Sequence, residues 1–287
     1  MKNMKELKWI LILLLICLSL PVCACGGDAS TTIAVVSTDY SIRELKAAPW
    51  DPEACDPSLD NPYWSYDCYV SKSNAYGDDT PLLVVNNEQK TTVHELYGDN
   101  GYLLGSDWGE FAAGLRYYPY TGTDSVTRPT TLLEDRCVDL FEPPPNTDSY
   151  AGKHGYVVTG WNKMLEPVQP TAVYVVHFPS EENEFQCYAE KLCDVSDDGA
   201  VASDISQNGT IYVACDSSLY AVTLGGAVTE IPVPDGWWDS CINSIVAIGD
   251  TLYIGSSFGV WTYDISGNGK GFTWFPAPYE EMVRDAA

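Results

Sequence analysis

Basic residues and histidines are scarce in this sequence. Its 287 residues include 15 Lys and Arg against 40 Asp and Glu, which gives a formal net charge of −25 at neutral pH. Because so negative a protein repels phosphate backbones and anionic membrane surfaces, nucleic acid is not expected as a partner. His94, His154 and His177 share no short motif, and a histidine without a carboxylate to orient it is weak support for acid–base catalysis. We expect His177, in an apolar run, to lie in the core or between structural repeats.

Recognisable catalytic and metal-binding motifs are also missing. The sequence contains no His-Glu-x-x-His, no Cys-x-x-Cys and no sialidase-type Asp box. Residues 255–259 match the Gly-x-Ser-x-Gly elbow of hydrolases, but they join two predicted strands rather than a strand and a helix. Residues 194–199 and 264–269 resemble the opening of a Ca²⁺ loop, yet both lack the bidentate Glu at the twelfth position. We interpret all three segments as turns and assign no catalytic residue or metal ligand.

An apolar run at the N-terminus indicates export. Three lysines precede residues 9–20, which are too few to span a membrane comfortably as a helix. The following Val22–Cys25 segment resembles a bacterial lipobox, so we predict that residues 1–24 are a signal peptide and that Cys25 carries a lipid. Two alternatives stay open. Ordinary cleavage after Ala24 would release a secreted protein, or the segment would remain as a membrane anchor.

Two copies of one pattern, offset by 41 residues, occupy the C-terminal part of the chain. Thr210–Cys215 aligns with Thr251–Ser256, and Leu219–Val222 aligns with Val260–Tyr263. Short strands separated by tight turns at a period near 40 are typical of β-propeller blades. The predicted strands of the two copies are 201–206, 210–215, 218–224, 227–233, 242–248, 251–256, 260–265 and 272–275.

The pattern recurs upstream with weaker matches. We predict two hairpins, 81–87 with 91–97 and 32–39 with 41–45. The spacing predicts an all-β fold, a β-propeller of about six four-stranded blades within a range of five to seven. One propeller domain would cover residues 32–287 after a short tether at 25–31. The further strands predicted upstream are 101–106, 113–120, 130–133, 155–160, 171–178 and 185–192.

Asn208–Val213 and Gly249–Gly255 resemble the repeats of secreted propellers of the two-component-regulator-propeller and YVTN/NHL-like groups. The resemblance is clearest over residues 200–276 and extends more weakly to residues 100–200. It implies the propeller fold and no particular activity, because this fold supports many functions.

Residues 46–80 differ in composition from the repeats, since they hold four prolines and six aspartates. We interpret them as a loop insertion closed by a disulfide, which export would permit. Residues 140–155 look like a second, shorter excursion. The sequence leaves the connectivity of the cysteines open, with Cys137 left over. The pairs we would draw are Cys55–Cys68, Cys187–Cys193 and Cys215–Cys241.

Tryptophans in predicted loops are the candidate ligand contacts. Exposed aromatic rings beside Asp and Asn suit the flat faces of sugars. The alternative is that these large side chains fill wedges between blades. The candidates are Trp50, Trp64, Trp108, Trp237 and Trp238.

The sequence favours a non-enzymatic propeller that binds a surface protein or a glycan. The alternative is a Ca²⁺-dependent hydrolase or lactonase working at the mouth of the channel, and a third possibility is a purely structural lipoprotein. No cofactor is expected, apart from Ca²⁺ in the second case. Gly26 after Cys25 permits sorting to an outer membrane, so we expect a lipoprotein of the bacterial cell envelope, or otherwise a periplasmic or secreted protein whose only membrane contact is through lipid.

Overall fold

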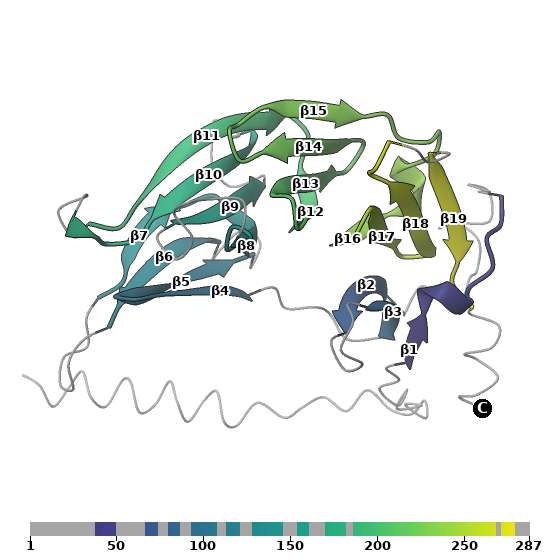
Figure 1. The fold of residues 1–287 in the computed structure, drawn as a ribbon, viewed down its shortest axis with the longest axis horizontal. Helices are drawn as coiled ribbons and strands as arrows, with labels where there is room; N and C mark the ends of the chain where they lie inside the picture. Colours follow the sequence, from purple (N-terminus) through teal and green to yellow (C-terminus); the bar gives the residue numbers. More distant parts are fainter. Residues whose placement is uncertain are drawn as a thin grey trace, which may run out of the picture. The chain divides into compact units, whose positions relative to one another are not determined.

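Antiparallel strands make up almost all of the regular structure (Figure 1). The structure is a computed structural model, and it describes residues 38–49, 67–73, 80–86, 93–107, 113–120, 128–145, 154–160, 170–181, 186–267 and 271–278. These residues form five sheets, accompanied by the short 3-10 helices η1 (Ile42–Glu44) and η5 (Trp238–Ser240). No helix in the described ranges is long and apolar enough to cross a membrane.

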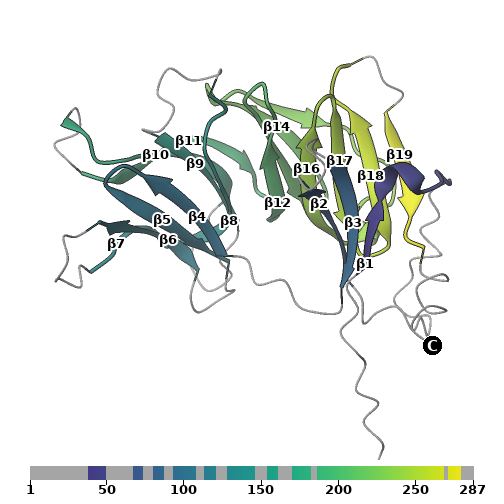
Figure 2. The same cartoon turned by 60° about the horizontal axis from the view of Figure 1, so that its bottom comes forward.

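Four of the five described sheets are meanders of four antiparallel strands in chain order, which is the arrangement of a propeller blade (Figures 1 and 2). Each sheet is named here by its first and last strands. The strands are β4 (Val93–Gly98), β5 (Gly101–Ser106), β6 (Gly114–Pro119) and β7 (Thr130–Leu133); β8 (Arg136–Phe141), β9 (His154–Gly160), β10 (Thr171–His177) and β11 (Tyr188–Ser196); β12 (Ala200–Ile205), β13 (Thr210–Cys215), β14 (Leu219–Thr223) and β15 (Val228–Ile231); β16 (Ile242–Ile248), β17 (Thr251–Ser256), β18 (Gly259–Asp264) and β19 (Phe272–Pro276).

The fifth sheet comes from the N-terminal part of the described chain and packs against the C-terminal sheet. It has the order β1-β3-β2, with β1 (Thr38–Ser41), β2 (Asp67–Ser73) and β3 (Thr80–Asn86). Strand β2 packs against β16 and β17 of the C-terminal sheet. Just after η1, the N–H of Ala48 donates to the carbonyl of Trp274 on β19 at 3.0 Å. Residues close to the N-terminus therefore pack on the last sheet.

Sheets that follow one another in the chain pack face to face. In β13, Ile211 and Val213 face the β8–β11 sheet, whereas Tyr212 and Ala214 belong to the cluster shared with the β16–β19 sheet. Successive side chains of a strand point to opposite faces, so a strand between two sheets is apolar at nearly every position. This burial explains the unbroken apolar runs of the repeats.

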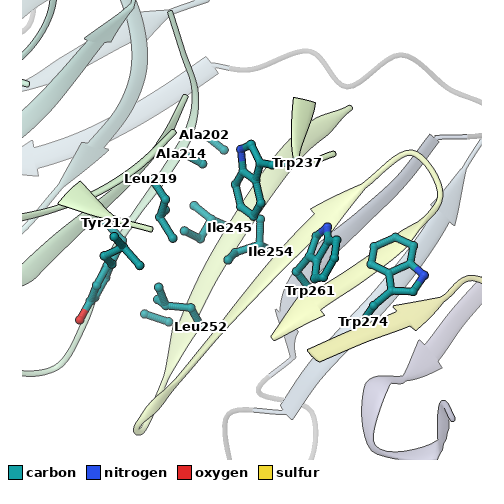
Figure 3. Packing of buried hydrophobic residues seen from close by; sticks show 12 residues of the cluster. Ala202, Tyr212, Ala214, Leu219, Trp237, Ile245, Leu252, Ile254, Trp261 and Trp274 are labelled. Carbon is teal, nitrogen blue, oxygen red and sulfur yellow. The ribbon is translucent and has the colours of Figure 1, made fainter. Parts of the chain in front are cut away.

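Trp237 is the largest fully buried side chain of the last sheet interface (Figure 3). Its ring lies 6.5 Å from that of Trp261 and 5.7 Å from that of Phe272, measured between centroids. It precedes η5, in the connection from β15 to β16. Trp237 therefore fills the wedge between two sheets, which is the alternative given above for the loop tryptophans.

The strands of the C-terminal repeats confirm the prediction closely, since 210–215, 242–248 and 251–256 coincide with β13, β16 and β17. The pairing of the two upstream hairpins was wrong. Strand β3 pairs with β1 and β2, whereas β4 pairs with β5 in another sheet. Residues 42–44 form η1 rather than a strand, and Ile42 packs in one apolar cluster with Val246 and Val260 of the C-terminal sheet.

The interpretation of residues 46–80 as a loop is wrong for residues 67–73, which form β2. Val70 of this strand is buried against the C-terminal sheet, although its sequence neighbours are polar. The predicted excursion at 140–155 begins inside β8, a strand that the sequence analysis missed, and ends inside β9. About six blades were predicted, and the described residues form five sheets.

We predict that the neighbouring tryptophans Trp237 and Trp238 differ sharply in their contribution to stability. Trp237 is 2% exposed and Trp238 is 63% exposed. Trp237→Ala should lower the free energy of unfolding by about 3–5 kcal/mol, because it leaves a large cavity between two sheets. Trp238→Ala is the matched control and should change it by less than about 0.5 kcal/mol. Urea unfolding followed by intrinsic fluorescence measures both; equal losses would contradict the wedge role.

Candidate functional site

One strand from each of the five described sheets contributes to a single pocket of about 270 Å³. The contributing strands are β2, β4, β8, β12 and β16, the first of each four-stranded meander together with the strand that packs on β16. Apolar side chains, mostly valines, form part of the wall. The polar lining residues are Ser71, His94, Asp139, Ser203, Asp204, Asn243 and Ser244.

A β-bulge recurs at the same place in three of these strands. The pairing of the first strand with the second skips one residue in β8, β12 and β16. The skipped residues are Val138, Val201 and Asn243, and all three line the pocket. Because a bulge bends its strand and redirects side chains, the repeat itself aims these positions at the pocket.

Asp139, Ala202 and Ser244 each follow a bulge and occupy equivalent positions in successive sheets. Ala202 and Ser244 lie opposite the next-to-last residue of the second strand, as does His94 in the unbulged strand β4. The same structural position therefore carries a different side chain in each sheet. The polar groups that the pocket offers to a ligand therefore depend on which residue each sheet carries at this position.

His94 and Asp139 form a pair across the interface of two sheets. His94 Nδ1 lies 2.9 Å from Asp139 Oδ1, and that oxygen also accepts the N–H of Leu140 at 2.9 Å. Since a carboxylate only accepts hydrogen bonds, the contact assigns the proton to Nδ1. In the neutral ring Nε2 is then an acceptor. It is buried, and no hydrogen-bond partner for it lies among the described residues.

Ser203 supplies a second buried polar atom at the pocket. Its Oγ has no hydrogen-bond partner within the described ranges, and the residue is 4% exposed. A buried polar group without a partner costs about 1–3 kcal/mol, so native proteins rarely keep one without a reason. Two such atoms at one pocket indicate a place where a ligand or water completes the hydrogen bonds.

The other polar side chains tie the pocket strands to one another. Asp204 Oδ2 accepts the N–H of Ala247 at 2.7 Å, which joins β12 to β16. Ser244 Oγ accepts the N–H of Val70 at 2.9 Å, which joins β16 to β2, and donates to Asn243 Oδ1 at 2.8 Å. These bonds satisfy main-chain donors at strand edges that pair with no further strand and make the pocket wall rigid.

Close contact between the β4–β7 and β8–β11 sheets fixes the His94–Asp139 pair. Gly105 on β5 has no room for a Cβ, because that atom would collide with the side chain of Cys137. An ion pair between Arg136 and Asp107 spans the same interface. Glycine is therefore required opposite His94 for the two sheets to approach.

Trp237 and Trp238, the two predicted ligand contacts within the described residues, do not line this pocket. Trp237 cannot stack on a ligand because its ring is enclosed by the sheet interface. Trp238 is exposed on η5. Trp50, Trp64 and Trp108 lie outside the described residues.

The segments with Ca²⁺-loop likeness are turns only in part: residues 194–196 belong to β11 and the chain bends at 197–198, while residues 265–266 turn after β18 and residues 268–269 lie outside the described ranges. The Asp198 carboxylate accepts the N–H groups of Gly199 and Ser217 at 3.0 and 2.7 Å, and the Ser217 hydroxyl at 2.6 Å. The Asp264 carboxylate accepts from both the N–H and the hydroxyl of Ser266. No group of three metal-ligating side chains that could hold an ion occurs within the described ranges.

Two of the histidines that sequence analysis considered separately are cross-strand neighbours. His177 on β10 lies opposite His154 on β9, and their ring centroids are 4.5 Å apart. The ring of Tyr188 stacks on His177 at the same distance, and Nε2 of His177 lies 3.6 Å from Glu190. His177 is half-buried in contact with residues of its own sheet, away from the pocket lining.

The Cys187–Cys193 bridge drawn from sequence is wrong. Cys193 lies within β11 and Cys187 immediately precedes it, and six extended residues place their Cα atoms about 20 Å apart. A disulfide needs no more than about 7 Å. The Cys215–Cys241 bridge is also not formed, since Cys215 is a free thiol buried in β13. Cys55 and the side chain of Cys68 lie outside the described residues.

No known family model matches this chain, and no curated protein is similar to it in sequence. Solved structures with partial similarity include a protein of unknown function from Bacteroides thetaiotaomicron, with a TM-score of 0.38 and 8% identity over 74% of this chain and 64% of that one. Virginiamycin B lyase from Staphylococcus aureus gives 0.32 and 9% over 74% and 75%, respectively. Apo AztD from Citrobacter koseri gives 0.33 and 12% over 81% and 63%.

The chain thus spans less than two thirds of the Bacteroides and Citrobacter chains. Overlaps this low carry no assignment of function. The sheets resemble propeller blades in their strand order within this chain.

We predict that the half-buried thiol of Cys187 and the buried thiol of Cys215 resist alkylation in the native protein. Burial raises the pKa of each thiol to about 12, from an ordinary value of 9.0. The thiolate is the reactive form, so both cysteines should stay unlabelled by iodoacetamide at pH 9 and become labelled in urea. Peptide mass spectrometry measures both states. Native labelling of Cys215 at the rate of the unfolded chain would contradict its burial.

The same raised pKa values give a pH dependence of stability. Above pH 9 the thiols ionise in the unfolded chain but not in the folded one, which favours unfolding. Their contribution to stability is therefore complete below pH 9 and lost as the pH rises toward 12. Cys215→Ala should reduce the fall in the urea midpoint between pH 8 and pH 10; an unchanged fall would contradict this prediction.

Proposed function

We propose that this protein is a non-enzymatic binding module of the bacterial cell envelope, whose pocket at the first strands of its sheets holds a small polar ligand. Residues 32–287 would form one propeller domain in which the described sheets are successive blades. The four-stranded meanders and the packing of each on the next support this arrangement.

The unsatisfied Nε2 of His94 carries the proposal. This atom and Ser203 Oγ are buried at the pocket without partners among the described residues, and the pair with Asp139 holds the imidazole in one orientation. A ligand with hydroxyl or N–H donors would complete these bonds. The volume of about 270 Å³ lies just below the usual range of ligand pockets, which begins at about 300 Å³. It suits a molecule the size of one sugar ring rather than a polymer.

Binding is favoured over catalysis by what surrounds His94. An activated serine nucleophile hydrogen-bonds to its base, whereas Ser203 Oγ makes no hydrogen bond to His94 or to any other described residue. Asp139 and Asp204 both line the pocket, but each accepts a main-chain N–H. The calcium-dependent hydrolase given as the alternative therefore lacks a specific observation in its favour.

Export and lipidation complete the proposal. The signal peptide and Cys25 lie outside the described residues, and their support comes from the lipobox-like sequence before Cys25. A tethered module with a small pocket would meet its ligand in the envelope or outside the cell.

We predict that ligands of the pocket are lost when its two unsatisfied atoms are changed. A thermal-shift screen of small polar compounds on the mature protein should give hits that raise the melting temperature; a ligand at one hundred times its Kd stabilises by about 2.7 kcal/mol. His94→Gln and Ser203→Ala should abolish these shifts. Trp238→Ala, at an exposed position, should retain them. Hits that survive both pocket variants would place the ligand elsewhere and overturn the proposal.

We also predict that Cys25 is the lipid attachment site. The exported protein should partition into detergent, and its N-terminal peptide should begin at Cys25 with the mass of an acylated cysteine. Cys25→Ala should release the protein from the membrane fraction, whereas Cys23→Ala, two residues upstream, should leave it there. An unmodified N-terminus at Cys25 would instead support plain secretion.

A further inference from the structure

The charge of the pocket restricts the class of ligand. Two carboxylates line it, from Asp139 on β8 and Asp204 on β12, and no lysine or arginine of the described residues lines it. The nearby Arg136 is paired with Asp107. The chain as a whole carries a net charge of −25. A carboxylate or phosphate ligand would enter this field against repulsion and find no lysine or arginine among the described lining residues to pair with.

The two carboxylates of the pocket only accept hydrogen bonds when ionised, whereas its serine hydroxyls and the Asn243 amide can both donate and accept. In the neutral ring with its proton on Nδ1, Nε2 of His94 accepts, and the ionised carboxylate of Asp204 only accepts. A primary ammonium group has three N–H donors and no acceptor, so it complements this set, and its charge is offset by the carboxylates. The valines and Ile245 of the wall can contact a short hydrocarbon chain.

We propose that the ligand is a small aliphatic amine, bound as its ammonium form with one N–H directed to His94 Nε2 and its positive charge beside Asp204. This inference rests on the proposed function and names the chemical class that the pocket takes. Charge complementarity separates it from a neutral hydroxyl ligand, which would use the same acceptor without needing either carboxylate.

Isothermal titration of the mature protein with matched four-carbon probes tests the inference. Butan-1-amine and 1,4-diaminobutane, both protonated at pH 7, should bind, while butan-1-ol and butanoate should bind at least tenfold more weakly. Asp204→Asn keeps an oxygen acceptor for the N–H of Ala247 but removes the charge, and should weaken amine binding at least tenfold. Glu230→Gln, on the exposed outer strand β15, removes the same charge far from the lining and is the control.

Histidine NMR provides a readout that does not depend on the folding of a variant. The chain has three histidines, and His154 and His177 lie in another part of the β8–β11 sheet as internal references. The amine should shift the ring signals of His94 and leave those of the other two in place. If His94 does not respond to a bound amine, the inference is wrong.

The other outcomes are distinguishable. If butan-1-ol or other neutral compounds bind in a His94-dependent way and amines bind no better, the amine class is wrong while the proposed function stands. If amines bind equally to Asp204→Asn and Glu230→Gln, the attraction is general electrostatics and the inference is overturned. If no amine, neutral compound or carboxylate binds at the pocket, the proposed function fails as well.

Discussion

Burial of both faces of a sheet against its neighbours is the constraint on which the rest of this structure depends. Each described four-stranded meander shares at least one apolar cluster with the sheet beside it, and the β8–β11 and β12–β15 sheets are covered on both sides. Such packing leaves little freedom at the first strands, where the faces of neighbouring sheets meet. Gly105 on β5, opposite His94 of the first strand, has no room for a side chain, and the large side chain of Trp237 fills the interface between the last two meanders.

Because of this packing, the polar side chains of the pocket lie on the first strands of the sheets. A strand edge that pairs with no further strand presents main-chain N–H groups that must find other acceptors. Asp204 and Ser244 supply them for Ala247 and Val70 on neighbouring strands, so side chains act in place of a missing strand. His94 Nε2 and Ser203 Oγ take no part in these bonds. A ligand can therefore bind to these two atoms without displacing the hydrogen bonds that join the pocket strands.

Local sequence was sufficient to predict most of the strands but not all of their partners. The C-terminal strands were predicted nearly to the residue, because their faces are both buried and their turns carry Gly and Asn. Strand β2 was missed, since only Val70 among its residues is an aliphatic side chain buried against the next sheet. The pairing of β1 with β3 joins Thr38 to Val85, and no local pattern encodes such a distant contact.

The pocket could not be predicted from motifs, because His94 and Asp139 are 45 positions apart in the sequence and lie in different sheets. A signal was nevertheless present in the sequence. Asp139 and Asp204 are carboxylates within strands whose other positions are mostly apolar, and a charge in a strand that packs on both faces must either be paired or face a cavity. His94 takes in β4 the register position that Ala202 and Ser244 take in β12 and β16. The loop tryptophans were proposed as ligand contacts because they are large aromatic residues. The residues that mark the pocket are instead the charged side chains within the first strands, Asp139 and Asp204.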